Sequence, residues 1–461
     1  MLRIQKYQRN RIAFVTVFLV VGTVVFLMTQ CIIPGFKCKD KITFVGPQPV
    51  TLDVWNVFED KDIYREIISK YRESNGYVTV NYETIQFEEY RAKLIEAFAA
   101  GKGPDIFVIH NTWLPTQKDR IAPAPSDMII SSEFDSIFPD VVKFDFVRMA
   151  EDGGRFVYAV PLAIETLGLF YNKDYFDAEN IEVSPKLWDE VVDFSRLFTR
   201  FDERGDIKIS GISLGAIANI NRSTDIVGLL MMQGGARMNN ESLTEATFDE
   251  TVITEAGDLK KEFKPGKDAV DFYLSFSDER KPVYSWNEKM SYSIDAFVEG
   301  KSVMMINYPH HIQTIKRKAP HLNFSTGPAP QLKDRKEDVN YANYWGFTVA
   351  KNSDAVKEAW RFIDFLASPD AVKLYVEKTK LPVARKDLVL WQQQDEELKH
   401  FSSQILTAKS WYQGDSDAAE AVLGEMVESA KSGKKSIEKA IEDAAAQISI
   451  IIKRIRSDQE I

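Results

Sequence analysis

The chain is poor in the side chains that most often carry metal or redox chemistry. Its 461 residues include 2 cysteines and 5 histidines. Cys31 and Cys38 both precede the globular part of the sequence, which excludes a disulfide or a cysteine metal site within that part. The histidines lack the spacing of a zinc-binding helix, and His310 and His311 would point to opposite faces of a strand. We therefore expect no metal and no cofactor.

An excess of positive charge is absent too. Lysine and arginine together number 58 against 68 for aspartate and glutamate, which gives a formal net charge of −10. Without a basic stripe to neutralise phosphates, we expect neither nucleic acid nor an anionic membrane surface as a partner. Aromatic residues, in contrast, are plentiful, with 17 Tyr, 29 Phe and 8 Trp. They can fill cores or form stacking platforms, and composition does not decide between these roles.

No catalytic motif fits the sequence well. No glycine-rich loop of the kind that cradles phosphates opens a helix. Residues 211–215 match the letters of a nucleophile elbow, but Ser213 falls within an expected strand and lacks a convincing histidine partner. A carbohydrate hydrolase that uses Glu165 would need a second carboxylate, and none is visibly paired with it. We therefore expect a protein that is not an enzyme.

The first 38 residues differ in kind from the rest. Basic residues within positions 3–11 precede an uncharged apolar run over 12–28. This is the layout of a secretory signal or signal anchor whose basic end stays in the cytoplasm. We expect residues 1–11 to form a cytoplasmic tail, 12–33 a transmembrane or signal-anchor helix, and 34–49 a linker. The globular part would then lie on the extracellular or periplasmic side of the cell membrane.

Cys31 is a candidate for lipid anchoring. It follows Leu27-Met28-Thr29-Gln30, which resembles a lipoprotein cleavage box. In such a box a small residue normally precedes the lipidated cysteine, and Gln30 departs from this pattern. The sequence leaves two alternatives open, lipidation of Cys31 after cleavage and an uncleaved membrane anchor.

From residue 50 onward, strand-like and helix-like patterns alternate. Segments 51–58, 78–82 and 105–110 predict strands, and apolar stripes over 60–71 and 87–98 predict helices. This order indicates an α/β lobe with a mainly parallel sheet, in which ligands bind beyond the carboxyl ends of the strands. A chain of 461 residues is too long for one core, so we expect two such lobes.

Residues 158–175 organise the rest of the sequence. They form two strand-like segments separated by Pro161, and Glu165 lies between them with apolar neighbours on both sides. A buried carboxylate costs several kcal/mol unless it is paired, so Glu165 should be paired or line a wet cleft. We interpret this stretch as a crossing between the two lobes. The alternative is that Glu165 lies in an ordinary surface loop.

Large aromatic rings, amides and imidazoles stand at the expected strand ends and loops. A sugar ring packs its C–H face on an aromatic ring, while amides, imidazoles and carboxylates bind its hydroxyls. The alternative for each ring taken alone is a place in a core. We expect the following residues to bind the ligand: Trp55, Asn56, His110, Asn111, Trp113, Glu165, Tyr308, His310, Tyr344, Trp345, Trp411 and Tyr412.

The chain resembles the extracellular solute-binding proteins of sugar ABC transporters, the maltose-binding-like group. The resemblance is carried by motifs in a family-like order and spacing, namely residues 103–107, 158–176, 185–190, 297–305, 327–330, 345–349, 359–366 and 381–383. It implies a type II periplasmic-binding-protein fold in which two α/β lobes are joined by crossover strands and close on the ligand by a hinge. We expect lobe 1 to comprise residues 50–163 and 327–366, and lobe 2 residues 164–323 and 369–461.

The resemblance also implies roles for several of the candidate residues. Glu165 matches the cleft-facing glutamate of the crossover motif, and residues 110–113 match a loop that lines the cleft. Tyr308 and His310 stand where the family often has a stacking ring, Trp345 precedes the glycine of a cleft-side strand, and residues 411–412 fall where a further ring often lies.

The expected function is capture of a mono- or oligosaccharide for delivery to an ABC transporter permease. A sensor subunit of the same fold, which signals to a receptor or kinase, is the alternative.

Overall fold

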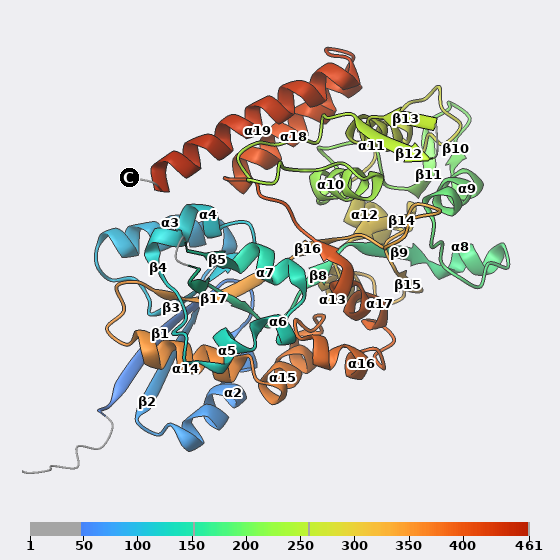
Figure 1. Ribbon diagram of the computed structural model, residues 1–461. Helices are drawn as coiled ribbons and strands as arrows, with labels where there is room; N and C mark the ends of the chain where they lie inside the picture. Colours follow the sequence, from blue (N-terminus) through green and yellow to red (C-terminus); the bar gives the residue numbers. More distant parts are fainter. Residues whose placement is uncertain (1–47, 151–152, 257–258, 460–461) are drawn as a thin grey trace, which may run out of the picture. The chain divides into compact units, whose positions relative to one another are not determined.

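The computed structural model describes residues 48–150, 153–256 and 259–459 (Figure 1). The expected cytoplasmic tail, the expected membrane helix over 12–33 and Cys31 lie outside these residues. Within the described ranges no helix is long and apolar enough to cross a membrane. The chain from Val50 onward forms one compact unit, in which the described residues form two larger β-sheets and three small ones, with helices packed on the larger two. The mixed α/β fold expected from the sequence is confirmed.

The first sheet belongs to lobe 1 and has the strand order β2-β1-β3-β17-β4, with β7 also pairing with β17. Strands β1, β2 and β3 are parallel, whereas β17 runs antiparallel to β3. The strands of this sheet are β1 (Val50–Asn56), β2 (Val78–Thr84), β3 (Ile106–His110), β4 (Ile121–Ala122), β7 (Val160–Pro161) and β17 (Trp345–Ala350). The helices and short strands associated with this lobe are α2 (Lys61–Ser74), α3 (Phe87–Ala99), α4 (Leu114–Gln117), η1 (Lys118–Arg120), α5 (Ile129–Ser132), α6 (Phe134–Ile137), α7 (Asp140–Phe146), β5 (Val147–Met149), β6 (Arg155–Val157) and α14 (Val356–Leu366).

Helix α2 shows how local sequence builds this lobe. The side chain of Asp60 accepts a hydrogen bond from the backbone N–H of Asp62 and so caps the helix. Tyr64, Ile67 and Tyr71 recur at helical spacing and are buried against the sheet. The polar cap and the apolar stripe therefore fix both the start of the helix and the face that it presents to the sheet.

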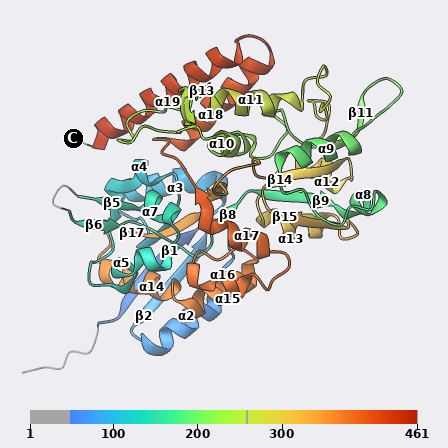
Figure 2. The same cartoon turned by 45° about the vertical axis from the view of Figure 1, so that its right-hand side comes forward.

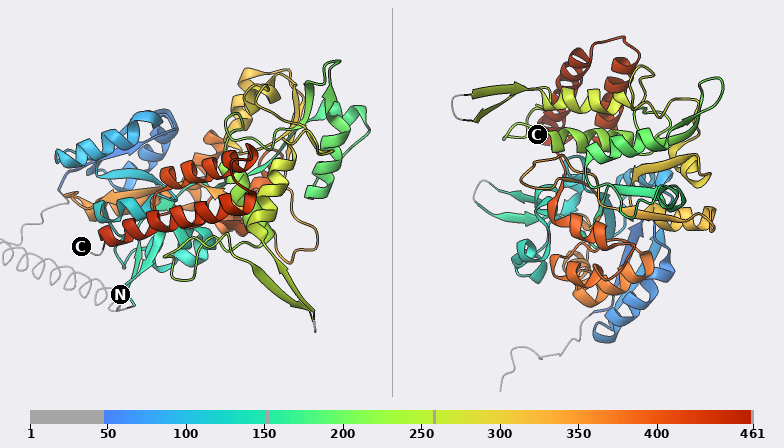
Figure 3. Two further views of the ribbon diagram at one scale, coloured as in Figure 1. Left: turned by 90° about the horizontal axis from the view of Figure 1, so that it is seen from above. Right: turned by 90° about the vertical axis from the view of Figure 1, so that its right-hand side faces the viewer.

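The second sheet belongs to lobe 2 and has the strand order β10-β11-β14-β9-β15. Figure 2 shows β9, β14 and β15 in this sheet with α9 and α12 near them. Its strands are β9 (Gly168–Asn172), β10 (Arg200–Phe201), β11 (Ile207–Ile212), β14 (Ser302–Asn307) and β15 (Phe324–Gly327). The other elements of this lobe are α8 (Lys173–Ala178), α9 (Trp188–Phe198), α10 (Ser223–Gly234), β12 (Val252–Ala256), β13 (Leu259–Phe263), α11 (Pro265–Ser275), α12 (Ser293–Val298), α13 (His310–Lys318), α18 (Ser416–Lys431) and α19 (Ile437–Gln459). Helices α18 and α19 run side by side (Figure 3).

A small sheet forms where the chain passes between the lobes. Strand β8 (Glu165–Thr166) pairs antiparallel with β16 (Asn340–Asn343), and β16 pairs parallel with β18 (Ala408–Lys409). These strands come from three well-separated parts of the chain, each of which connects one lobe to the other. Glu165 lies on the first of them, at the crossing that the sequence indicated.

The first part of the segment after residue 369 does not pack on the lobe to which the sequence analysis assigned it. Val372 and Tyr375 of α15 (Pro369–Thr379) and Val389 are buried in the core of lobe 1. The expected start of lobe 2 at residue 369 therefore does not match this packing. Leu398 and Phe401 then pack with Phe170 and Met305 of the lobe 2 strands, and Trp411 lies in the larger core of lobe 2. The short elements of this segment are η2 (Lys386–Leu388), α16 (Val389–Gln392), α17 (Lys399–Gln404) and η3 (Ile405–Thr407).

Candidate functional site

Two adjoining cavities lie between the carboxyl ends of the lobe 1 strands and the facing parts of lobe 2. The first has a volume of about 290 Å³ and the second about 230 Å³. Residues of both lobes line each cavity. Four residues line both cavities and mark where they meet: Phe58, His310, Asn343 and Trp345.

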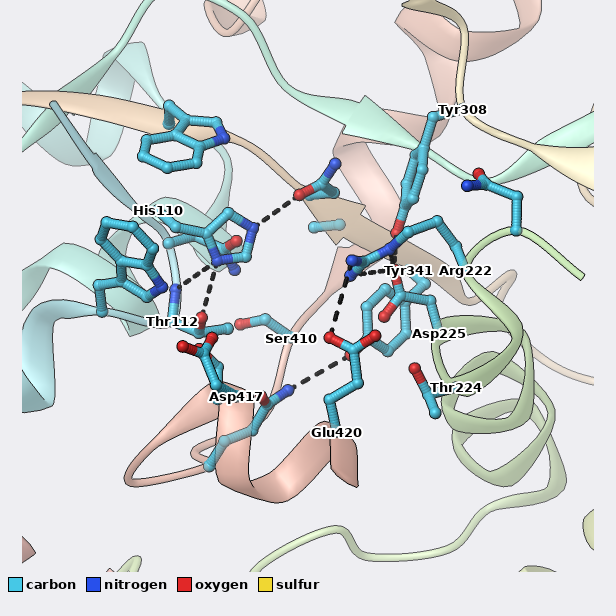
Figure 4. A pocket seen from close by; sticks show the side chains of 18 of the residues that line it. His110, Thr112, Arg222, Thr224, Asp225, Tyr308, Tyr341, Ser410, Asp417 and Glu420 are labelled. Atoms are coloured by element: carbon cyan, nitrogen blue, oxygen red, sulfur yellow. Dashed lines mark hydrogen bonds and ion pairs between the residues drawn. The ribbon is translucent and has the colours of Figure 1, made fainter. Parts of the chain in front are cut away.

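The elements that end at the first cavity explain its lining. Strand β3 ends at His110, and the following loop carries Asn111, Thr112 and Trp113 to the wall. Strand β17 begins beside this point, because Trp345 pairs with His110 across the antiparallel ladder. Lobe 2 contributes the amino-terminal turns of α10, α13 and α18, whose polar side chains face the same space (Figure 4).

Aromatic rings form one wall of the cavities, on the side of lobe 1. The rings of Trp345 and Trp113 meet edge to face, with centroids 4.9 Å apart. Phe58 and Phe87 are stacked at 5.7 Å and each also meets Trp345 edge to face. Phe58 is 58% exposed and Phe87 50% exposed, although both are large apolar side chains. Exposed rings at a polar cavity provide a ready surface for a ligand with an apolar face.

His110 is held in a defined orientation at this wall. Its Nδ1 lies 2.7 Å from Oγ1 of Thr112, and its Nε2 lies 2.6 Å from Oδ1 of Asn343. Burial lowers the pKa of His110 to about 4, so the imidazole is neutral at pH 7. Asn343 Oδ1 can only accept, which makes Nε2 the protonated nitrogen and leaves Nδ1 to accept from the threonine hydroxyl.

Asn111 connects the cavity to a buried carboxylate. Its Nδ2 donates to Oδ2 of Asp145 at 3.0 Å, and the hydroxyls of Tyr344 and Ser410 also donate to Asp145. Burial raises the pKa of Asp145 to about 6, although these three hydrogen bonds oppose the rise. The Oδ1 atom of Asn111 is buried and has no hydrogen-bond partner among the described residues.

On the opposite side, Arg222 is tied into a network of carboxylates (Figure 4). Its Nε and Nη2 each lie 2.8 Å from Oδ2 of Asp225, and Nη1 lies 3.8 Å from Glu420. Asp225 also accepts from the hydroxyl of the fully buried Tyr308 at 2.7 Å. The close carboxylate of Asp225 raises the pKa of Arg222. The guanidinium charge is thus already compensated within the protein.

Glu165 pairs with the start of α13. Its Oε1 accepts from the backbone N–H and faces Nδ1 of His310, both at 2.9 Å. Burial opposes protonation of His310, but the Glu165 carboxylate outweighs it and raises the pKa of His310. The prediction that His310 and His311 would point to opposite faces is wrong, because both stand on the first turn of a helix, with their Nε2 atoms 3.1 Å apart.

Glu59 is a second carboxylate at the second cavity. Its Oε1 accepts from the hydroxyl of Tyr375 at 2.7 Å, and its Oε2 accepts from Nδ2 of Asn56 at 2.9 Å. Burial raises the pKa of Glu59, and the charge of Glu165 adds to the rise. Within the part of the chain that the structure describes, no lysine, arginine or histidine forms an ion pair with it.

The two cavities bring together most of the residues singled out from the sequence. The first cavity is lined by His110, Asn111, Trp113 and Tyr308, the second by Asn56, Glu165 and Tyr344, and both by His310 and Trp345. Trp55, Trp411 and Tyr412 line neither. The Trp55 ring lies beneath Nζ of Lys93, while Trp411 is buried in the core of lobe 2 and Tyr412 packs beside it.

Other lining residues were not anticipated. Phe58 and Glu59 stand two and three positions after Asn56, so continuing the strand-end argument by that distance would have found them. Arg222 lies in the loop that precedes α10. The loop and the strand end were visible in the sequence, whereas their meeting across the lobes was not. No group of three or more histidine, cysteine, aspartate or glutamate side chains in the described ranges is arranged to hold a metal ion.

Comparison with known proteins assigns the chain to a family. The family model described as bacterial extracellular solute-binding protein matches residues 66–400. The chain belongs to this family.

Relatives and solved structures agree with this assignment over most of the length. The chain is 23% identical to the maltodextrin-binding protein MdxE of Bacillus subtilis over 428 residues, which covers 90% of this chain and 93% of the relative. It is also similar in fold to the cyclic alpha-maltosyl-1,6-maltose binding protein of Arthrobacter globiformis, with a TM-score of 0.70, 18% identity, and coverage of 88% and 100% of the two chains. The sugar-binding protein MalE of Xanthomonas citri gives a TM-score of 0.69 at 19% identity, covering 89% and 99%. These structures support the fold.

Proposed function

We propose that this solute-binding protein captures a carbohydrate in the two adjoining cavities and delivers it to an ABC transporter permease. The observation that carries the proposal is the wall of exposed or half-buried rings, Phe58, Phe87 and Trp345, beside fixed hydrogen-bonding groups. A pyranose ring has apolar faces and a hydroxyl edge, which this arrangement matches. The N-terminal segment would anchor the protein to the outer face of the cytoplasmic membrane.

The hydrogen-bonding groups suit hydroxyls because several are fixed. His110 and Asn111 at the first cavity are held by hydrogen bonds to Asn343 and Asp145, and His311 lines the same cavity. Burial lowers the pKa of His311 to about 3, and the adjacent His310 contributes, so this imidazole stays neutral. Pre-oriented neutral acceptors bind hydroxyls without a large reorganisation cost.

Capture would proceed by closure of the lobes around the crossing strands. Each cavity is lined from both lobes, so a ligand that touches both favours the closed arrangement. The binding energy shifts this equilibrium and drives no covalent change. The names of relatives, which include maltodextrin- and maltotriose-binding proteins, favour a saccharide.

A thermal-shift screen of the purified full-length protein against sugars, polyols and peptides tests the proposal. A ligand at one hundred times its dissociation constant should add about 2.7 kcal/mol to the free energy of unfolding. For a body of this size the midpoint should rise by on the order of a few degrees. A response confined to one class of saccharide supports the proposal. A response to peptides alone, or to no saccharide in a broad panel, contradicts it.

A further inference from the structure

The second cavity has a charge pattern that hydroxyl binding does not require. Two carboxylates, Glu59 and Glu165, line it, and the adjacent His310 is the basic partner of Glu165. Glu59 receives hydrogen bonds only from neutral groups, a tyrosine hydroxyl and an asparagine amide. A partly buried carboxylate without a cation is costly, so this site gains from a positive charge supplied from outside the protein.

Aromatic rings surround the same space. Tyr64, Phe347 and Tyr375 form the buried side of the cavity, and Phe58 and Trp345 form the side that adjoins the first cavity. The faces of such rings attract a cationic nitrogen, and a set of rings around a carboxylate is a known way to hold an ammonium group. The aromatic rings and the carboxylate would therefore each attract the same positive charge of a ligand.

Among the described residues, the first cavity is lined by no cation that lacks an acidic partner. Its guanidinium, Arg222, is paired with Asp225 and faces Glu420, and Asp417 at the same wall is paired with Arg91. A phosphate or carboxylate placed there would meet these acids before it could recruit Arg222. The charge of both cavities thus opposes anions, and among the described lining residues only those of the second cavity include an acid without a charged partner.

We infer that the second cavity selects a ligand that carries a positively charged nitrogen, with Glu59 as the residue that binds it. Building on the proposed carbohydrate function, the substrate class is an amino sugar whose ammonium group enters the second cavity while a hydroxylated ring occupies the first. Glu165 lies on the crossing strand β8 and lines this cavity. A ligand bound there therefore also contacts the hinge region between the lobes.

Titration calorimetry with matched disaccharides tests this inference on the full-length protein. The β-1,4-linked glucosamine disaccharide has the ammonium group, cellobiose has a hydroxyl in its place, and N,N′-diacetylchitobiose has a neutral amide. We expect the glucosamine disaccharide to bind at least tenfold tighter than either of the other two. Glu59→Gln should reduce this preference at least fivefold.

A matched control separates binding of the ammonium group by Glu59 from the effect of the protein's net charge. Glu299 is an exposed glutamate on lobe 2 that pairs with Lys301 and lines neither cavity. Glu299→Gln removes the same formal charge and should leave the preference unchanged. If Glu299→Gln lowers the preference as much as Glu59→Gln, net charge accounts for the effect and the inference is overturned.

The outcomes also separate this inference from the proposed function. Equal binding of all three disaccharides, or tighter binding of cellobiose, overturns the inference and keeps carbohydrate capture. Choline serves as a cation without a sugar ring. If choline binds in a Glu59-dependent manner and no saccharide of the broad panel binds, the cation site is supported and carbohydrate capture is contradicted. If neither choline nor the glucosamine disaccharide binds, the inference is overturned.

Discussion

Replacing Asp145 by asparagine should remove a pH dependence of folding stability. Asp145 is buried at 5% exposure and accepts hydrogen bonds from Asn111, Tyr344 and Ser410. Burial raises its pKa from the ordinary value of 3.8 to about 6. Between these pH values the folded protein keeps a proton that the unfolded chain has lost. Stability therefore falls as the pH rises from about 4 to about 6 and then levels off.

The size of this effect follows from the two pKa values. A difference of about two pH units between the folded and unfolded states corresponds to roughly 3 kcal/mol, as an order of magnitude. Asp145→Asn has nearly the same shape and no titration in this range. The difference in unfolding free energy between the variant and the wild type should therefore shift in favour of the variant by up to that amount between pH 4 and pH 7.

Urea denaturation at a series of pH values measures this difference. Other groups titrate equally in both proteins and cancel. Asp135 serves as a control, because it is exposed and its ion pairs with Lys143 and Arg155 lower its pKa despite partial burial. Asp135→Asn should give a dependence of opposite sign that lies below about pH 4, where wild type loses the stabilisation from these ion pairs as the carboxylate is protonated. A constant difference between Asp145→Asn and wild type from pH 4 to pH 7 would refute the reasoning about this buried carboxylate.

Three further predictions concern the rings and the close packing of the strands. Trp345→Ala should weaken binding of the saccharide by about 1–3 kcal/mol, measured by calorimetry, because the ring lines both cavities; an unchanged dissociation constant removes it from the site. Phe58→Ala should weaken binding without lowering the melting temperature by more than about 1 °C, because an exposed side chain contributes little to the core; a large loss of stability contradicts this role. Gly211→Ala should lower the unfolding free energy by about 1–3 kcal/mol in urea, because its Cβ would lie 2.2 Å from the backbone oxygen of Ser195; Gly76→Ala, whose Cβ would meet only the backbone oxygen of Arg72 at 3.8 Å, is the matched control without a clash.

The fold was largely predictable because its local signals agree with one another. Asp60 caps a helix whose apolar stripe faces the sheet, and strand β3 begins with the continuous apolar run Ile106–Ile109. Periodicity and caps are local properties, so the sequence carries them directly. The packing of α15 and the following segment on lobe 1 was not predictable in this way, because nothing local says which of two cores a helix joins.

The candidate site shows where this reasoning stops. The strand-end argument found His110 and Trp345, which are neighbours across a ladder. It also selected Trp55, whose ring contacts Lys93 while the next residue, Asn56, lines the cavity. Alternate residues of a strand face opposite sides, so an error of one position decides whether a residue reaches the ligand.

Long-range assembly accounts for the rest of the site. Arg222 and Glu420 lie at the starts of two helices, α10 and α18, which are distant in sequence and meet at the first cavity. Taken alone in the sequence, each of these two residues would be interpreted as an ordinary charged side chain in solvent. Trp411 shows the converse, because an aromatic residue in a late loop proved to be part of a core. Which polar residues share a cavity depends on how the two lobes face each other.

Isothermal titration of the full-length protein with the saccharide that gives the largest thermal shift tests the central claim most directly. We expect one saturable site per chain, with a negative heat-capacity change because apolar ring surface is buried. The same titration with Trp345→Ala should show at least fivefold weaker binding. Absence of saturable binding by any saccharide, or binding of equal affinity in the variant, would contradict carbohydrate capture in these two cavities.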